Sequence, residues 1–227
     1  MEALQVRVAS EMARKILDDL PESDGKPMGE TEYHIRAILE LYQLLDEFFQ
    51  ADENVYVGAD MLYYYDADSP TEYIVPDVFV VKGVKKHMRR TYRIWDEKVA
   101  PCVVFEITSR GTYFDDLGKK RLLYETVGVR EYFVFDPRSE YLKPQFQGYE
   151  LRELGYEPLP ARADGTLFSG ELNLFLQPTP HFIRPIDPKS GKPLPTYSDL
   201  DKRAKQAEAE NEDLRAELER LRKRKSA

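Results

Sequence analysis

Two apolar runs of strand length, separated by one helical segment, constrain the fold of this chain most strongly. The first run is Cys102–Ile107, and the second lies within REYFVFDP, which ends at Asp136–Pro137. Between them, the apolar spacing from about Phe114 to Val127 predicts a helix, and Gly128 is suited to end it. A strand, a helix and a strand in this order predict a crossover unit with parallel strands, and hence an α/β fold.

Further helices and strands are expected before and after this unit. Leu4 to Leu20 has helical spacing, and a second helix is predicted to begin at Thr31. Residues 53–81 are expected to form strands separated by a turn at Asp66 to Pro70. Beyond Pro144, the segments QGYEL and GELNLFL are expected to be shorter and more peripheral strands.

A carboxylate interrupts the first apolar run. Glu106 follows Val103–Val104–Phe105 and precedes Ile107, at a position where a buried strand is predicted. Because an isolated charge is costly to bury, such a group usually has a partner. That partner is a lysine, a protonated neighbour or a metal ion.

Other ionisable residues are predicted to lie near Glu106. Asp77 stands within the preceding apolar strand, directly after a proline. Lys120 lies on the predicted helix, with Asp116 one turn before it and Tyr124 one turn after it. This i, i+4, i+8 spacing places the three helical residues on roughly one face. If that face turns toward the sheet, the Lys120 ammonium approaches the two carboxylates.

Two acids on neighbouring strands suit a hard divalent cation such as Mg²⁺, which binds through carboxylates and retains several waters. A metal-bound water becomes a nucleophile near neutral pH, and a lysine beside it can stabilise charge on a phosphate oxygen. These residues therefore suit metal-assisted phosphodiester hydrolysis. The alternative is purely structural: Asp77 starts a strand, and Lys120 is an ion-pair partner for Glu106.

The connection between the two acidic strands, Lys82 to Arg93, is the most basic stretch outside the C-terminus. A basic loop at the edge of an active cleft can contact phosphates, which position a duplex without reading its sequence. The alternative is a solvated loop. The residues expected to contact nucleic acid are Lys85, Lys86, Arg89, Arg90 and Arg93.

Composition narrows the possible classes of protein. Apolar residues make up 42% of the chain, which excludes wholesale disorder. The net charge of −8 argues against a protein that coats nucleic acid along its whole surface. The single cysteine, Cys102, cannot form an internal disulfide, which favours a reducing cytoplasm. The chain has no apolar stretch long enough to span a membrane, so no membrane partner is expected.

The composition changes around Arg184 and predicts three parts: a globular domain at 1–185, a Pro-rich linker at 186–199 and a charged helix at 200–227. Asn211 takes an a-type heptad position, which would fix the register of a parallel dimer. A coiled coil with a second copy or a partner helix, and a solvated single helix, both remain open. The heptad seam consists of Ala204, Ala207, Asn211, Leu214, Leu218 and Leu221.

Four blocks in order, VPDVFVV, VVFEITS, FDDLGKKRLLY and GVREYFVFDP, resemble the Uma-two family of restriction-endonuclease-like proteins. That family belongs to the PD-(D/E)XK nuclease superfamily. The resemblance covers roughly Glu30 to Leu176. The Glu30–Thr31–x–x–His34 start and the charged helical tail are similar to members that are abundant in cyanobacteria.

The resemblance implies a restriction-endonuclease-like fold, in which a mixed β-sheet of about four or five strands is flanked by helices. Asp77 matches the aspartate of the superfamily motif, and Glu106 matches its second acid. The motif lysine normally stands two residues after that acid, where this chain has Thr108. The resemblance implies that Lys120, on the helix, takes its place.

The leading hypothesis is a Mg²⁺-dependent DNA endonuclease, with Mn²⁺ as a substitute ion. Asp77, Glu106 and the backbone carbonyl of Ile107 would bind the metal, and Lys120 would assist the attacking water. One alternative is a DNA- or protein-binding module of the same fold with little or no cleavage, which Thr108 and the acidic net charge favour. Another is a scaffold in which Glu106 and Lys120 form a buried ion pair. The residues expected to support the site are Asp116, Tyr124 and Glu30.

Overall fold

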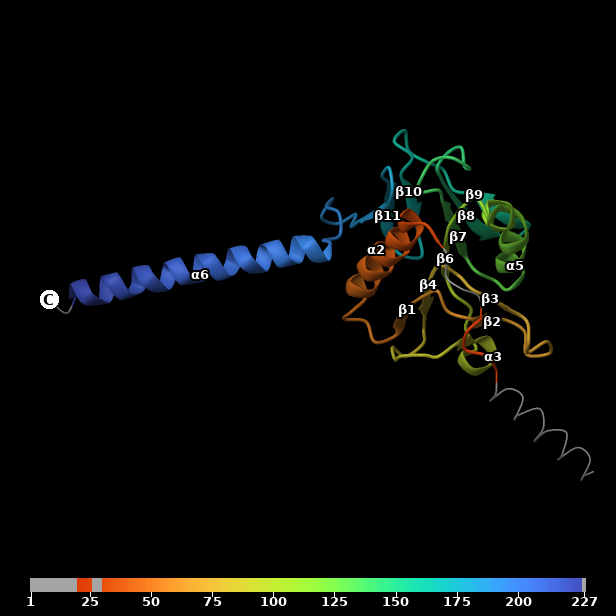
Figure 1. The fold of residues 1–227 in the computed structure, drawn as a ribbon, viewed down its shortest axis with the longest axis horizontal. Coiled ribbons are helices and arrows are strands. Elements are labelled where there is room, and N and C mark those ends of the chain that lie inside the picture. The colour runs from red at the N-terminus through yellow and green to blue at the C-terminus, as the bar shows by residue number, and fades with distance from the viewer. Residues whose placement is uncertain (1–19, 26–29, 226–227) are drawn as a thin grey trace, which may run out of the picture.

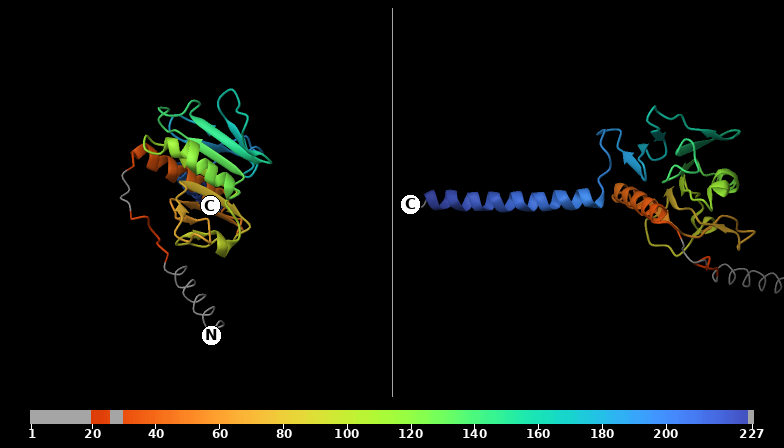
Figure 2. Two further views of the ribbon diagram at one scale, coloured as in Figure 1. Left: turned by 90° about the vertical axis from the view of Figure 1, so that its right-hand side faces the viewer. Right: turned by 45° about the horizontal axis from the view of Figure 1, so that its top comes forward.

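The computed structural model describes residues 20–25 and 30–225, and its elements form a mixed α/β fold (Figures 1 and 2). The predicted helix at Leu4–Leu20 lies outside the described residues apart from Leu20. The α/β class is confirmed: a mixed sheet is flanked by helices, and a long C-terminal helix follows. The second predicted helix is confirmed as α2 (Glu32–Phe48), with Thr31 as its N-cap.

The main sheet has six strands in the order β1-β4-β6-β7-β8-β9, more than the four or five that the resemblance implied. Strands β6 and β7 are parallel, and every other neighbouring pair in this sheet is antiparallel. The strands are β1 (Val55–Ala59), β4 (Val78–Lys82), β6 (Val103–Ile107), β7 (Glu131–Phe135), β8 (Phe146–Arg152) and β9 (Gly155–Pro158).

The connection from β6 to β7 is the predicted crossover. It consists of α4 (Tyr113–Asp115), a single π-helical turn η1 (Asp116–Lys120) and α5 (Arg121–Thr126). The helix therefore lies where the sequence predicts it, but a wide turn interrupts its regular hydrogen bonding. Such π-turns are often found at functional sites.

The main sheet is covered on both faces because its strands alternate apolar side chains between two cores. In β6, Val103, Phe105 and Ile107 belong to the core that α2 covers. Val104 belongs to the opposite core, together with Tyr124 of α5. By this alternation Glu106 lies on the α5 face, and Figure 2 shows α2 and α5 as separate layers.

The expectation that QGYEL forms a short, peripheral strand was wrong. Strand β8 has seven residues and pairs with both β7 and β9 inside the main sheet. A Cβ atom at Gly148 would lie 2.8 Å from Phe133 and from Leu167, so only glycine allows this strand to pack so closely. A glycine weakens the strand signal in the sequence, and here it marks a close approach.

Two three-stranded sheets complete the globular part. One has the order β3 (Tyr73–Ile74), β2 (Tyr63–Tyr64), β5 (Tyr92–Arg93), and α3 (Ile94–Glu97) directly follows β5. The other has the order β10 (Leu167–Ser169), β11 (Leu174–Pro178), β12 (Ile183–Ile186).

Helix α6 (Tyr197–Lys225) extends away from the sheets (Figure 1). Of its heptad seam, Leu214 is 59% exposed in the single chain. Pairing of this helix with another helix stays a prediction. Among the described residues, no helix is both long and apolar enough to cross a membrane.

Candidate active site

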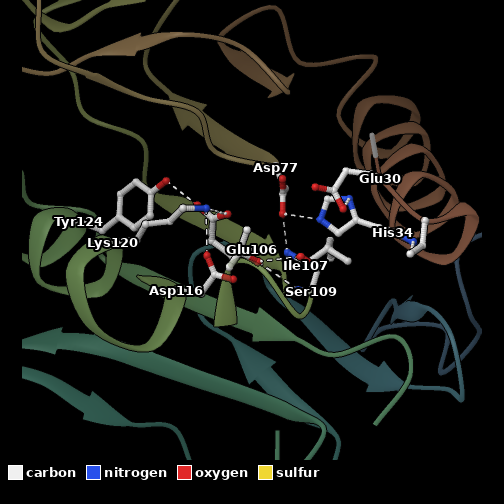
Figure 3. A network of polar contacts seen from close by, with 11 residues as sticks. Glu30, His34, Asp77, Glu106, Ile107, Ser109, Asp116, Lys120 and Tyr124 are labelled. Carbon is white, nitrogen blue, oxygen red and sulfur yellow. Dashed lines mark hydrogen bonds and ion pairs between the residues drawn. The ribbon is translucent and has the colours of Figure 1, made fainter. Parts of the chain in front are cut away.

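Asp77 and Glu106 approach each other across two neighbouring strands (Figure 3). Strands β4 and β6 pair with Val78 opposite Phe105, and the same register continued by one residue sets Asp77 opposite Glu106. The Ile107 N–H donates a hydrogen bond of 2.6 Å to Asp77 Oδ2. Glu106 is fully buried, whereas the Asp77 side chain is 15% exposed. The sheet register therefore brings together the two acids that the sequence singled out.

Both carboxylate oxygens of Glu106 are held by groups from the crossover helix. Lys120 Nζ lies 2.6 Å from Glu106 Oε2, and the Tyr124 hydroxyl donates a 2.6 Å hydrogen bond to Oε1. Figure 3 shows Lys120 and Tyr124 directed from the same helix toward Glu106. The helix thus turns toward the sheet the face that carries Lys120 and Tyr124, which the i, i+4 spacing places together.

Asp116 belongs to the same cluster. Its Oδ1 atom lies 2.9 Å from Lys120 Nζ, and its side chain is only 1% exposed. Its Oδ2 atom is buried without a hydrogen-bond partner among the described residues. The Tyr132 hydroxyl on β7 donates a 2.8 Å hydrogen bond to the Asp116 backbone carbonyl and so ties the π-turn to the sheet. We call Asp77, Glu106 and Asp116 the carboxylate cluster.

Excess negative charge defines the electrostatics of the carboxylate cluster. Burial raises the pKa of Glu106 well above its usual range; Asp77 and Asp116 add to this, and the Lys120 ammonium opposes it. Burial alone would lower the pKa of Lys120, but Glu106, Asp116 and Asp77 outweigh it and raise that pKa. The acidic neighbours raise both pKa values: they add to the effect of burial on Glu106 and outweigh the effect of burial on Lys120. The cluster therefore favours the binding of positive charge.

Two residues lie on the other side of Asp77: His34 in helix α2, and Glu30, which precedes the N-cap of that helix. His34 Nε2 lies 3.6 Å from Asp77 Oδ2, and His34 Nδ1 lies 3.8 Å from Glu30 Oε2. The Thr31 side chain accepts a hydrogen bond from the His34 N–H, which fixes the first turn of the helix. Burial acts to lower the pKa of His34, but the contacts with Asp77 and Glu30 prevail and raise it.

The residues present fit a divalent cation by charge and by donor type. Three carboxylates and one ammonium leave two negative charges uncompensated, and carboxylate oxygens are the ligands that Mg²⁺ prefers. The unpartnered Asp116 Oδ2 is a further oxygen donor. Within the part of the chain that the structure describes, however, no three Asp, Glu, His or Cys side chains already form a metal-binding arrangement. A cation would require some side chains to move.

The site opens into a cleft of about 1020 Å³. Asp77 and Lys120 line it, whereas Glu106 and Asp116 do not. His34 and Glu30 also border the cleft, on the side of α2. The carboxylate cluster is therefore reached from outside through Asp77 and Lys120.

The five basic residues expected to contact nucleic acid do not act as one patch. Lys86 and Arg89 line the cleft. The Arg89 guanidinium is nonetheless bound to Glu97, with Nε 2.6 Å from Oε1, and lies 4.2 Å above the ring of Tyr56. Lys86 Nζ donates a 2.9 Å hydrogen bond to the Phe49 carbonyl.

The other three lie elsewhere on the surface. Arg90 pairs with Glu22, and Arg93 Nε lies 2.7 Å from Asp96 Oδ2. Lys85 is exposed. The structure thus brings two of the five to the cleft, and most of them have acidic partners on the same chain.

Sequence reasoning named His34 and Thr108 but did not predict the contacts of either residue. His34 contacts Asp77, and the only signal for this is the Glu30–His34 spacing of one turn at the start of a helix. Thr108, at the position of the motif lysine, is 1% exposed and its hydroxyl has no partner among the described residues. No pattern in the sequence indicates that this hydroxyl is unpartnered.

One comparison with known proteins, the scan against family models, identifies a family for this chain. The family model Uma2, described as "Putative restriction endonuclease", matches residues 24–175, which is more than half of the chain. Among solved structures, the chain is similar to a "putative nuclease belonging to DUF820" from Anabaena variabilis ATCC 29413. That similarity has 18% sequence identity and a TM-score of 0.48, and it covers 69% of this chain and 89% of the other. The search of curated proteins gave no match.

Proposed function

The chain belongs to the Uma2 family of restriction-endonuclease-like nucleases, and on that premise we propose that it is a Mg²⁺-dependent endonuclease that hydrolyses DNA. One observation supports this most directly. Two carboxylates from adjacent strands, Asp77 and Glu106, lie close to a lysine ammonium, and Asp77 and that lysine line a cleft. This is a donor set for a divalent cation together with a fixed positive charge for a phosphate.

The proposed cation ligands are the carboxylates of Asp77 and Glu106 and the backbone carbonyl of Ile107. Mg²⁺ is the proposed ion, and Mn²⁺ would substitute for it. When bound, the ion would lower the pKa of a water molecule, so that hydroxide is available to attack a phosphodiester near neutral pH. The excess negative charge of the carboxylate cluster supports this assignment.

Lys120 is proposed to stabilise charge rather than to accept a proton. The surrounding carboxylates raise its pKa, so its amine stays protonated throughout the physiological range. An ammonium at the cleft wall can donate hydrogen bonds to a phosphate oxygen and to the attacking water. In this proposal Tyr124 and Asp116 hold Glu106 and Lys120 in place, while Glu30 supports Asp77 through His34.

DNA is the proposed substrate, and the cleft is its proposed point of entry. Of the five basic residues, Lys85 and Lys86 are the best candidates for phosphate contact. Lys85 is exposed, and Lys86 lines the cleft with its Nζ 3.8 Å from Asp46 Oδ1, a longer contact than the three arginines make with their acids. Arg89, Arg90 and Arg93 would have to share their acidic partners with phosphates, so they rank lower.

The C-terminal helix is proposed to be a separate part that pairs with a second copy or with another helix. It follows a segment at 186–199 that the composition marks as a linker, after a globular domain at 1–185. The exposed Leu214 on its heptad seam supports pairing. Cys102, a free and buried thiol, is compatible with a reducing cytoplasm as the place of action.

Cleavage of plasmid and single-stranded DNA with Mg²⁺, with Mn²⁺ and with EDTA tests this proposal. We expect nicking that requires the cation and is lost in Asp77→Ala, because one of two carboxylate ligands is removed. Glu47→Ala is the matched control, since Glu47 is an exposed acid that does not line the cleft, and this variant should retain activity. Loss of activity in both variants would contradict the assignment of the site.

A folded wild-type protein that cleaves with neither cation would favour the second candidate, a binding module of the same fold. Thr108, at the position of the motif lysine, supports that candidate. In that case Asp77→Ala should leave DNA binding unchanged in a gel-shift assay.

A further inference from the structure

Glu106 is closed to a cation in the arrangement that the structure describes. Its Oε2 is bound by Lys120 at 2.6 Å and its Oε1 by Tyr124 at 2.6 Å. The residue has no exposed surface, and the cleft is lined by Lys120 but not by Glu106. A cation that enters through the cleft therefore meets the Lys120 ammonium before it reaches Glu106.

Asp116 offers the same ammonium a second carboxylate. Lys120 Nζ is already 2.9 Å from Asp116 Oδ1, so it bridges the two acids. The other oxygen, Asp116 Oδ2, is buried and has no hydrogen-bond donor among the described residues. An unsatisfied buried acceptor is unfavourable and calls for an explanation. A second position for the Lys120 ammonium would explain it.

We propose that Lys120 and a divalent cation compete for Glu106, and that Asp116 is the positioning residue that receives the ammonium when the cation binds. This inference rests on the cation site of the proposed function. Lysine has three donors on a flexible four-carbon stem, so rotation of the side chain alone can move its hydrogen bonds from Glu106 to Asp116.

The charge balance agrees with retention of Lys120 in both states. With all three carboxyl groups of the cluster ionised and no cation bound, they face one ammonium and two negative charges remain. A divalent cation that joins the ammonium would bring the cluster to neutrality. If the cation expelled Lys120, a single negative charge would remain and the phosphate would lose its donor. Asp116 keeps the ammonium beside the cleft while Glu106 becomes available.

Calorimetric titration of the full chain with Mn²⁺, in the absence of DNA, tests this competition. Lys120→Met, which keeps the length of the side chain and removes its charge, should bind Mn²⁺ at least tenfold more tightly than the wild type. Asp116→Asn should bind it more weakly, because the ammonium then has no other carboxylate and stays on Glu106. In the Lys120→Met background, Asp116→Asn should lower the Mn²⁺ affinity clearly less, because no ammonium is left to compete for Glu106.

The controls come from the same helix. Lys119 and Asp115 are exposed neighbours, so Lys119→Met and Asp115→Asn report the effect of changing one surface charge. Both should leave Mn²⁺ affinity within about twofold of the wild type, as expected for screened surface charges. If Lys120→Met does not fold without a cation, Lys120→Gln, which also removes the charge, replaces it as the second background for Asp116→Asn.

The outcomes separate this inference from the proposed function. If the wild type binds Mn²⁺ and Asp77→Ala abolishes binding, the cation site stands. If Lys120→Met then binds Mn²⁺ no more tightly than the wild type does, the competition is refuted but the cation site is not. The competition is also refuted if Asp116→Asn changes the Mn²⁺ affinity equally in the wild-type and Lys120→Met backgrounds. If neither the wild type nor Lys120→Met binds Mn²⁺, both the proposed cation site and the proposed competition are refuted. Binding by Lys120→Met alone would support the competition most strongly.

Discussion

Two buried tyrosines allow a direct test of how Glu106 is stabilised. Tyr124 and Tyr63 are both fully buried, yet only the Tyr124 hydroxyl has a hydrogen-bond partner, Glu106 Oε1 at 2.6 Å. The Tyr63 hydroxyl is buried without a partner among the described residues. Replacing each tyrosine by phenylalanine removes one oxygen atom and retains the ring. The two variants therefore differ chiefly in whether a hydrogen bond is lost.

Opposite effects are expected from the two substitutions. A hydrogen bond to a charged group contributes about 1.5–3 kcal/mol, so Tyr124→Phe should lower the free energy of unfolding by that amount. In a domain of this size, this corresponds to a fall in the melting temperature of roughly 3–12 °C. Tyr63→Phe removes a hydroxyl that is already unsatisfied, so it should be neutral or should stabilise the fold by up to about 3 kcal/mol.

Urea denaturation at neutral pH with EDTA measures both differences on the cation-free protein. The slope of the free energy against urea should stay the same in all three proteins, so that midpoint shifts report stability. A free energy of unfolding for Tyr124→Phe within about 0.5 kcal/mol of the wild-type value would refute the reasoning, because the Glu106 oxygen would then be stable without its hydrogen-bond donor. A loss for Tyr63→Phe as large as that for Tyr124→Phe would also refute it.

Two further predictions concern the basic loop and the C-terminal helix. The hydrogen bond from Arg89 lowers the pKa of Glu97, so the pair stabilises the fold above the unfolded pKa of Glu97 and loses this effect as pH falls through the lower, folded value. Glu97→Gln should therefore cost about 1.5–3 kcal/mol at pH 7, and the difference in urea stability should shrink below about pH 4; a constant difference down to pH 2 would contradict the assignment. If α6 pairs with a second copy, sedimentation of the full chain should show a mass that rises with concentration, and Leu214→Glu should abolish this rise. A wild-type mass that stays at one chain would exclude the dimer.

The strands and the acid pair were predictable because they depend on local alternation. Apolar runs place β4 and β6, and the interruptions of these runs at Asp77 and Glu106 identify the two acids of the site. Register then follows, because a shift by one residue would move every side chain to the other face. The i, i+4 spacing likewise placed Asp116, Lys120 and Tyr124 on one helix face, but only the structure shows that this face turns toward the sheet.

The contacts that the sequence did not reveal are tertiary or depend on hydrogen-bond geometry. The π-turn at Asp116–Lys120 has no distinctive composition, so it reads as ordinary helix. His34 reaches Asp77 only because α2 packs across the start of β4. Arg89 looks available for phosphate in a basic loop, but it stacks on Tyr56 and binds Glu97, and no periodic pattern in the sequence records such pairs.

The position of the lysine changes what holds the site together. A lysine two residues after Glu106 would share its strand, and the strand alone would fix the distance between the two side chains. In this chain that position is Thr108, which is fully buried, and the ammonium instead comes from a helix packed on the sheet. Its distance from Glu106 then depends on contacts between helix and sheet, such as the 2.8 Å hydrogen bond from Tyr132 to the Asp116 carbonyl. Substitutions that loosen this packing should therefore disturb the site even where they touch neither Asp77 nor Lys120.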